Sequence, residues 1–390
     1  YPELSQGRTR IEKTILAEEE RFAGALARGM ELLESVFWKM KKDGLTQVPG
    51  EELFKLHDTF GFPLDLAADV AEEQGYTVDK AGFEAAMRNQ RDKARSAWAG
   101  SGEQKVATVY RTLESEHGAT EFVGYDNLTA DAVVLALVQN NRAVDVLAEG
   151  CEGEVLLNLT PFYAESGGQV GDRGIIEFSE GKAEVSSVLK RAGKSFLHQV
   201  KVLSGNLHTG TQVSAQVCAA KRSRTEAHHT ATHLLQAALR HTLGDHVQQA
   251  GSYVDSERLR FDFTHFEAIP LEKLQEIERF VNACIREALP VEISFKSIEE
   301  ARKEGAMALF GEKYEERVRV VQTGDKSKEL CGGCHVRNTG VIGICKILSD
   351  SAIAAGVRRI EAVCGEPCLD MLQERERQFQ TVLQTLSARP

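Results

Sequence analysis

Two histidines stand four residues apart in the segment HTATH, at His229 and His233. The surrounding residues predict a helix over about 223–243, and residues four apart lie on one face of a helix, a turn from each other. Such a helix can offer two imidazole nitrogens to one metal ion. The same spacing is often incidental, so a metal role for this pair requires further ligands from elsewhere in the chain.

A second group of candidate ligands lies about a hundred residues further on, in the segment CGGCH at 331–335. Glycine allows tight backbone curvature, so this turn would bring a thiolate and the imidazole of His335 toward one point. Two histidines from a helix, with a cysteine and a histidine from a turn, make a borderline-soft set of nitrogen and sulfur ligands. This set suits Zn²⁺ best, and we expect zinc as the cofactor.

The cysteine pair has two other interpretations. CxxC is a redox motif in thioredoxin-like proteins, but there it lies at a helix start after a strand. CxxCH also attaches c-type haem, which occurs in an oxidising compartment. The first residues, YPELSQGRTR, contain no hydrophobic export signal, and haem would leave His229 and His233 unused. Zinc is therefore the favoured interpretation.

The neighbours of the ligands narrow the type of zinc site. A metalloprotease helix would read HExxH, with glutamate as general base, and a zinc deaminase would carry glutamate in HxE. Position 230 is threonine, so no carboxylate is expected beside the ligands. A substrate whose bond is more easily hydrolysed than a peptide bond, and which carries its own base, is then more suitable. An aminoacyl ester is such a substrate, because a ribose hydroxyl beside it can act as the base.

The elements that must position these ligands point to a multidomain chain with three regions. Residues 1–100 show helical periodicity, and the segment AGSG at 99–102 is typical of a linker. Short β-type runs predict a small antiparallel barrel or sandwich over 106–217. Alternating patterns predict an α+β core over 218–366, and a polar helix begins in 367–390. The strands expected in the barrel are 132–138, 143–148, 153–159, 174–178, 183–189 and 212–217.

Composition is that of a globular protein: 390 residues, of which 42% are hydrophobic and 27% charged. No apolar run approaches the ~20 residues that cross a bilayer. The 8 cysteines are sparse and several lie in apolar stretches, so we expect reduced thiols and a cytoplasmic location. The net charge of −11 argues weakly against a nucleic-acid partner, although local basic groups such as Arg358 and Arg359 could still contact phosphates.

Several segments resemble the editing half of alanyl-tRNA synthetases and the free-standing editing proteins related to them. They are HTATHLL at 229–235, CGG-x-HV at 331–336, TPFYAESGGQVGD at 160–172 and GAMALFGEKY at 305–314. LHDTFGFPLDL at 56–66 resembles the end of the tRNA-recognition domain of the synthetase, which the free-standing editors lack. From this resemblance we expect the chain to be an internal piece of an alanyl-tRNA synthetase, without the aminoacylation core and most of the C-terminal region.

The resemblance implies roles for individual residues. The zinc ligands would be His229, His233, Cys331 and His335. The editing pocket would be lined by Gln249, Gly167 and Gly168, and either Thr230 or Thr232 would touch the side chain of the substrate. The family usually has threonine where this chain has Cys334, so two thiols compete for one ligand position, and the matching position favours Cys331. Asp65 would contact the acceptor stem of tRNA, and Arg358 is a further candidate for tRNA binding.

These implications lead to an expected function. A pocket for alanine cannot strongly reject glycine or serine, since such differences give on the order of 10–200-fold discrimination. We expect zinc-dependent hydrolysis of mischarged Ser-tRNA(Ala) and Gly-tRNA(Ala), together with acceptor-stem recognition by the helical region. The zinc would polarise the substrate, activate a water or only organise the pocket. The alternative is a non-catalytic, zinc-stapled tRNA-binding module, which the lack of a carboxylate beside the ligands favours.

Overall fold

The computed structural model describes residues 8–97, 108–191, 195–307, 316–354 and 356–385. Contacts divide the chain into two compact units, Tyr1–Lys105 and Val106–Pro390. The chain is multidomain and contains a six-stranded barrel, as the sequence predicted in general terms. Within the described part of the chain, none of the helices has both the length and the apolar content needed to cross a membrane.

The first unit is built from helices. These are α2 (Arg8–Asp43), α3 (Gly50–Phe60), α4 (Leu64–Glu73) and α5 (Lys80–Ala97), with a parallel pair of short strands, β1 (Gln47–Val48) and β2 (Thr77–Val78). The chain breaks between two helices at 61–63, because Gly61 ends α3 in the left-handed conformation and Pro63 precedes α4. The core of this unit includes Leu33, Leu53 and Phe62.

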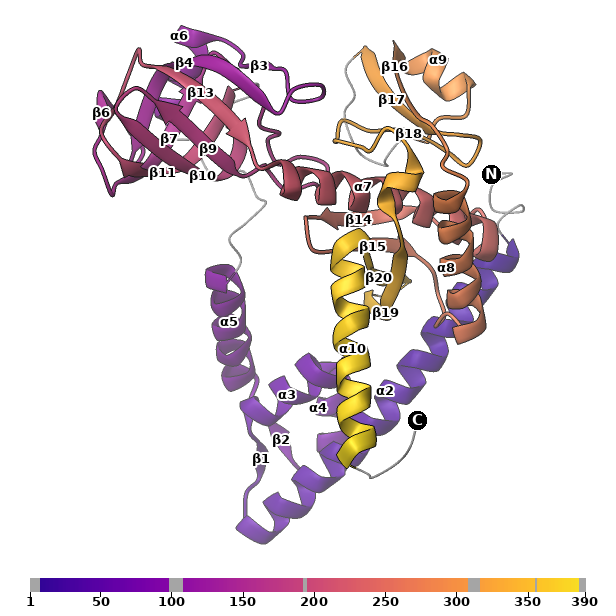
Figure 1. Ribbon diagram of the computed structural model, residues 1–390. Helices are drawn as coiled ribbons and strands as arrows, with labels where there is room; N and C mark the ends of the chain where they lie inside the picture. The colour runs from indigo at the N-terminus through magenta and orange to yellow at the C-terminus, as the bar shows by residue number, and fades with distance from the viewer. Residues whose placement is uncertain (1–7, 98–107, 192–194, 308–315, 355, 386–390) are drawn as a thin grey trace. The chain divides into compact units, whose positions relative to one another are not determined.

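The second unit begins with α6 (Thr108–His117) and an antiparallel barrel (Figure 1). Six strands close the barrel in the order β4, β7, β11, β10, β9 and β13, because β13 pairs back onto β4. Their bounds are β4 (Thr129–Gln139), β7 (Glu152–Leu157), β9 (Gly174–Phe178), β10 (Gly181–Arg191), β11 (Ser195–Ser204) and β13 (Gln212–Val217). The short strands around it are β3 (Glu121–Phe122), β5 (Arg142–Val144), β6 (Val146–Leu147), β8 (Leu159–Thr160) and β12 (Leu207–His208).

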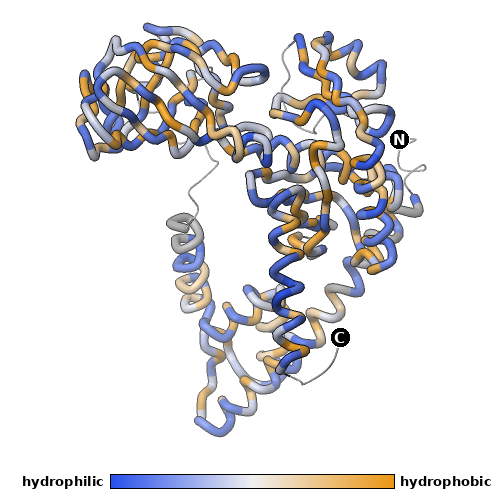
Figure 2. The backbone as a smooth tube through the Cα atoms, in the orientation of Figure 1, coloured by the Kyte–Doolittle hydropathy of each residue, from blue (hydrophilic) through white to orange (hydrophobic). Residues whose placement is uncertain are grey.

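The strand pattern of the barrel was predicted only in part. The bounds expected for β9 and β13 match the structure, while β11 and α6 were not predicted. Hydrophobic and hydrophilic residues are interspersed along the barrel strands (Figure 2), and the inward residues form one buried cluster. The structure therefore shows a closed barrel, which was one of the two architectures expected for this region.

The α+β part follows the barrel directly (Figure 1). One antiparallel sheet has the order β14 (Gln249–Val254), β15 (Leu259–Thr264), β20 (Val357–Cys364) and β19 (Cys345–Ala354). A second has the order β16 (Val291–Ser297), β17 (Arg317–Thr323) and β18 (Ser327–Leu330). The helices are α7 (Ala219–Leu243), α8 (Leu271–Arg286), α9 (Ile298–Lys303), the 3₁₀ helix η1 (Thr339–Ile342) and α10 (Gly365–Thr385).

Helix α7 is the element that positions most of the candidate site. Its residues Leu234, Leu235 and Leu239 belong to the same buried cluster as Phe261 and Phe263 of β15. Burial of such side chains contributes about 1.5–3 kcal/mol each, so the orientation of α7 is strongly fixed. The CGGCH turn follows β18, and η1 is the next element after it.

Candidate metal centre

The middle of α7 carries His229 and His233, and both side chains are buried. Their ring centroids are 5.3 Å apart, which is the result of the four-residue spacing. Imidazole is seldom buried without polar partners, since an unsatisfied polar group costs free energy in a nonpolar surrounding. The burial of two neighbouring histidines therefore indicates that both have a specific partner.

The turn at 331–335 approaches α7 and is held by two side chains. Arg319 of β17 donates from Nη1 to the carbonyl oxygens of Cys331 at 2.8 Å and Gly333 at 2.9 Å. The hydroxyl of Tyr125 donates to the carbonyl oxygen of Gly332 at 2.7 Å. The Arg319 guanidinium also lies over the Tyr125 ring, 4.2 Å from its centroid. The turn is thus fixed from β17 and from the segment between β3 and β4.

Gly333 is required by the close approach of this turn to α7. A Cβ atom built on Gly333 would lie 2.0 Å from Cε1 of His229, whereas one on Gly332 would meet nothing within 4 Å. The sequence predicted that the glycines provide curvature. The structure shows that the second glycine also provides room for the first histidine.

The four predicted ligands meet in one place. The candidate ligand atoms of His229, His233, Cys331 and His335 all lie within 4.8 Å of one another. Sγ of Cys331 is 3.4 Å from Nε2 of His229 and 3.3 Å from Nε2 of His335. Tetrahedral zinc with ordinary Zn–N and Zn–S bonds places its ligand atoms about 3.3–3.8 Å apart. The donor set and these separations fit zinc.

Cys334 is not part of this group of ligand atoms. Its thiol is buried, and burial raises its pKa to about 12, so it stays protonated at neutral pH. Its backbone N–H donates to Oε1 of Gln169 at 2.8 Å. Of the two candidate thiols, the structure brings Cys331 to the histidines.

Each of the three histidines has an oxygen atom facing its Nδ1. Nδ1 of His229 is 2.7 Å from Oε1 of Gln169, and Nδ1 of His335 is 3.1 Å from Oγ1 of Thr230. Nδ1 of His233 lies 3.6 Å from Oε2 of Glu329, an ion-pair distance that is too long for a hydrogen bond. Metal-binding histidines usually have such a partner on the nitrogen that does not bind the metal.

Burial and charge act in opposite directions on these groups. Burial raises the pKa of the Cys331 thiol, but the attraction of His229 and His335 outweighs it and holds this pKa well below its usual value. Burial, followed by repulsion from His229, lowers the pKa of His335 well below its usual value. Burial lowers the pKa of His233 while Glu329 raises it, and the result is about 9. The thiolate of Cys331 and neutral His335 are the forms that bind a metal ion.

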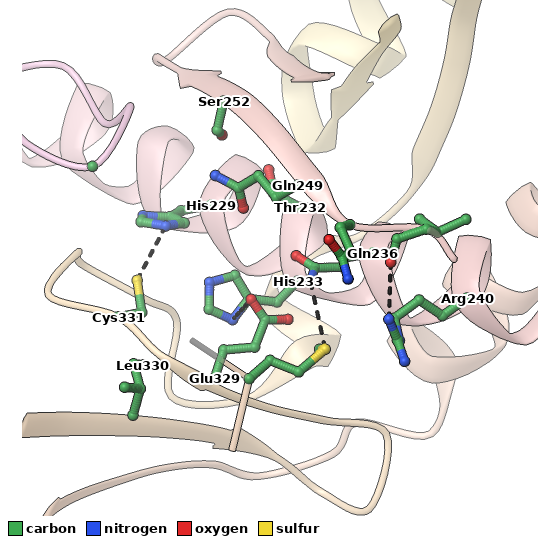
Figure 3. A pocket seen from close by; sticks show the side chains of 14 residues that line it. His229, Thr232, His233, Gln236, Arg240, Gln249, Ser252, Glu329, Leu330 and Cys331 are labelled. Carbon is green, nitrogen blue, oxygen red and sulfur yellow. Dashed lines mark hydrogen bonds and ion pairs between the residues drawn. The ribbon is translucent and has the colours of Figure 1, made fainter. Parts of the chain in front are cut away.

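A cavity of about 170 Å³ opens beside these ligands (Figure 3). His229, His233 and Cys331 form part of its wall, and the predicted pocket residues Gln249, Thr232 and Gly167 also line it. The rest of its lining is Gln236, Arg240, Val247, Gln248, Ser252, Met307, Glu329 and Leu330. The segment 308–315, which contains most of the GAMALFGEKY motif, lies outside the described residues.

Two of the predicted pocket residues lie behind the wall of this cavity. Thr230 is fully buried, and its hydroxyl contacts Nδ1 of His335 and accepts from the N–H of Val336 at 3.2 Å. Gly168 has a positive φ of 84°, and a Cβ atom there would lie 2.5 Å from the carbonyl oxygen of Ser252. Both residues therefore shape the site without lining the cavity.

Sequence reasoning missed two polar residues of the site. Glu329 lines the cavity two residues before Cys331, so the expectation that no carboxylate lies near the ligands was wrong. Gln169 is fully buried and contacts His229, although only the glycines before it were singled out. The position of Gln169 in SGGQVGD was the available signal. Its partner lies 60 residues away, so the contact itself could not be foreseen.

The two residues expected to bind tRNA lie elsewhere. Asp65 is exposed in the first turn of α4, in the first unit. Arg358 of β20 is buried, and its guanidinium donates to both carboxylate oxygens of Asp350 at 2.7 Å. The charge of Arg358 is thus already paired within the fold, whereas the carboxylate of Asp65 is open to solvent.

Two models of known protein families match separate parts of this chain. A family model described as "tRNA synthetases class II (A)" matches residues 1–220. A second, described as "Threonyl and Alanyl tRNA synthetase second additional domain", matches residues 318–361, a range that includes the CGGCH turn. The second match thus covers two of the four candidate ligands, Cys331 and His335.

Curated relatives cover the whole chain. The alanine–tRNA ligase of Geobacillus kaustophilus (strain HTA426) is 46% identical over 100% of this chain, which covers 44% of the relative. That of Pelotomaculum thermopropionicum is 47% identical over 100% of the chain and 45% of the relative, and that of Pseudomonas syringae pv. syringae is 48% identical over 97% and 42%. The chain therefore belongs to the class II (A) tRNA synthetases and, within them, to the alanyl-tRNA synthetase family. It spans just under half the length of these relatives.

Proposed function

We propose that the second unit of this chain removes wrongly attached amino acids from tRNA(Ala), by zinc-dependent hydrolysis of Ser-tRNA(Ala) and Gly-tRNA(Ala). The observation that supports this most is the cavity that opens beside the four converging ligand atoms, with three of the ligand residues in its wall. An alanine site discriminates poorly against glycine and serine, so a second, hydrolytic site gives a synthetase the accuracy that binding alone does not.

The ligands of the zinc ion are His229, His233, Cys331 and His335 in this proposal. The bound zinc would supply a positive charge that polarises the ester or its attacking water. The donor atoms of three ligands belong to residues of the cavity wall, so an aminoacyl ester in the cavity would lie beside the metal. The remaining wall residues bind and orient the substrate.

Thr232 is the side chain best placed to recognise a serine hydroxyl. Thr232 lines the cavity, and because its hydroxyl donates to the carbonyl oxygen of His228 at 2.9 Å, its oxygen keeps only acceptor capacity for a further partner. Gln249 lines the same cavity (Figure 3), and its amide carries donors and an acceptor for the aminoacyl or ribose groups. Thr230 acts through His335, which it holds from behind.

The first unit is proposed to recognise the acceptor stem of tRNA(Ala), with Asp65 among its contacts. An exposed carboxylate in a helical unit can accept hydrogen bonds from base amino groups. If this is right, Asp65→Ala weakens binding of the chain to tRNA(Ala), and Asp58→Ala on the neighbouring helix α3 does not. Equal affinity of the two variants would contradict the role of Asp65.

The second candidate function is a zinc-stapled module that binds tRNA and hydrolyses nothing. Four protein ligands close the coordination shell of a structural zinc, and the convergence of four candidates favours this alternative. The cavity beside the ligands and the carboxylate of Glu329 within it favour hydrolysis.

Deacylation of Ser-tRNA(Ala) by the whole 390-residue chain distinguishes the two functions. The expected result is one zinc ion per chain and release of serine well above the spontaneous rate, with both lost in a Cys331→Ala, His335→Ala variant. Cys151→Ala is the matched control, because this partly exposed cysteine lies in the barrel. Bound zinc with no release of serine would establish the binding module, and a chain without metal would refute both proposals.

A further inference from the structure

We propose that the barrel half of the second unit holds the metal centre in its binding geometry, and that Gln169 is the positioning residue through which it acts. Gln169 lies in the loop between β8 and β9, outside α7 and outside the CGGCH turn. It is fully buried and contacts both of these ligand-bearing segments. This inference rests on the proposed zinc site, but not on the hydrolytic reaction.

The hydrogen bonds of Gln169 determine which nitrogen of His229 is free for a metal. The backbone N–H of Cys334 can only donate, and it lies 2.8 Å from the same side-chain atom of Gln169 that contacts His229. That atom must therefore be the amide oxygen, and Nδ1 of His229, at 2.7 Å, must carry the proton. The lone pair of His229 is then on Nε2, the atom that lies 3.4 Å from Sγ of Cys331.

The same oxygen sets the distance between the helix and the turn. It accepts one hydrogen bond from α7, at His229, and one from the turn, at Cys334. Because Gly333 lies directly against the His229 ring, neither segment can move toward the other. Gln169 and Gly333 together therefore fix the gap in which the ligand atoms meet.

The loop that carries Gln169 is itself held on both sides. Its backbone pairs with the end of β14, where Val170 N–H donates to the carbonyl of Val254 at 3.0 Å and Val254 N–H donates to that of Gly168 at 2.7 Å. Three residues after Gln169, Asp172 forms a buried ion pair with Arg222 of α7.

Arg222 also ties the start of this same loop, and one other barrel loop, to α7. Its guanidinium donates to the carbonyl oxygen of Pro161 at 3.0 Å and to that of Gly124. Tyr125, the residue after Gly124, in turn donates to the carbonyl oxygen of Gly332 in the ligand turn. The anchoring of the barrel loops and the position of the ligand turn are thus connected through a short series of contacts.

A partner on the far nitrogen of a metal-binding histidine is worth 10–100-fold in metal affinity in other proteins. Replacing Gln169 with methionine keeps the length of the side chain and removes the acceptor. We expect Gln169→Met to weaken zinc binding by about 10–100-fold. Gln169→Glu retains an acceptor for His229 and Cys334, and it should restore most of the affinity.

The test measures zinc affinity of the whole chain by competition with a chromophoric chelator, independently of tRNA. Gln212→Met is the matched control, since Gln212 is exposed on β13 of the barrel. Near-ultraviolet circular dichroism of the metal-free variants shows whether the barrel is folded. Absorption of the Co²⁺-substituted chain reports the ligand geometry, and its bands should shift in Gln169→Met and return in Gln169→Glu.

Equal zinc affinity and equal Co²⁺ spectra in the parent, Gln169→Met and Gln212→Met would overturn the inference while leaving the proposed function intact. If Gln169→Met does not fold, Gln169→Asn decides, because its shorter side chain withdraws the acceptor from His229 while keeping the amide. Parent-like affinity in Gln169→Asn would also overturn the inference. A parent chain without zinc would refute the proposed function, and with it any metal centre for Gln169 to position.

Discussion

Gly333 and Gly332 are adjacent in the ligand turn, yet a methyl group added to each would meet very different surroundings. On Gly333 it would lie 2.0 Å from Cε1 and 2.4 Å from Nδ1 of His229, and 2.8 Å from Oε1 of Gln169. Carbon atoms in contact are about 3.5–4.0 Å apart, so the ring or the turn must move by roughly 1.5 Å. On Gly332 the same group would meet nothing within 4 Å.

The size of this displacement sets the expected effect. Arg319 and Tyr125 hold the turn through hydrogen bonds of 2.7–2.9 Å, so the His229 ring is the part that must yield. Metal–ligand distances tolerate only about 0.2 Å, so a shift of this size removes His229 from the zinc ion. We expect Gly333→Ala to lower zinc affinity by at least about 10-fold. The metal-free chain should lose about 1–3 kcal/mol of unfolding free energy through overpacking.

Chelator competition and urea unfolding of the metal-free chain measure these two effects separately. Gly332→Ala should keep both the zinc affinity and the stability of the parent. The reasoning is refuted if Gly333→Ala binds zinc as tightly as Gly332→Ala, because the close contact between the turn and α7 would then have no influence on the metal.

Three further outcomes are expected. Cys334→Ser should retain bound zinc and Cys331→Ser should lose it, as metal analysis of the two purified chains will show; equal zinc content would contradict the assignment of the thiol ligand. Burial lowers the pKa of His198 to about 4 in the folded barrel, so the unfolded chain binds more protons between pH 6.5 and 4. The contribution of His198 to the free energy of unfolding should be fully present above pH 6.5 and should fall by about 3 kcal/mol as the pH drops to 4. Urea unfolding should show that His198→Gln reduces this loss. Arg222→Met breaks a buried ion pair and should destabilise the chain by about 3–5 kcal/mol, whereas Arg224→Met breaks an exposed pair and should cost at most about 1 kcal/mol; similar unfolding midpoints would contradict this contrast.

The local patterns of the sequence predicted the helical character of the first unit, the helix at about 223–243, and runs that overlap five of the six barrel strands. Strand β9 begins at a glycine and has the buried Ile176 at its centre, and its limits were predicted correctly. Strand β11 was missed because Ser195–His198 is buried without alternation, including the polar His198. Helix α6 was missed because it is short and only Tyr110 and Leu113 are buried, which leaves little periodicity to detect.

The site was predictable where its residues are close in sequence and not where they are distant. The spacing within HTATH and CGGCH was enough to propose three histidines and one of two cysteines as ligands, because each segment presents its side chains locally, and the family resemblance then favoured Cys331. The contact of Gln169 with His229 depends on how a barrel loop docks onto α7, over 60 residues. The side chain of Glu329 points into the cavity because β18 ends beside α7, and no local pattern carries that information.

The central claim is that three histidines and one cysteine meet around a single zinc ion. X-ray absorption at the zinc edge of the purified chain tests it most directly, because the spectrum counts nitrogen and sulfur neighbours. We expect three nitrogen ligands at about 2.0–2.1 Å and one sulfur ligand at about 2.3 Å. This pattern should lose its sulfur component in Cys331→Ser and keep it in Cys334→Ser. Two sulfur neighbours in the parent, or a shell made mainly of oxygen, would contradict the proposed metal centre.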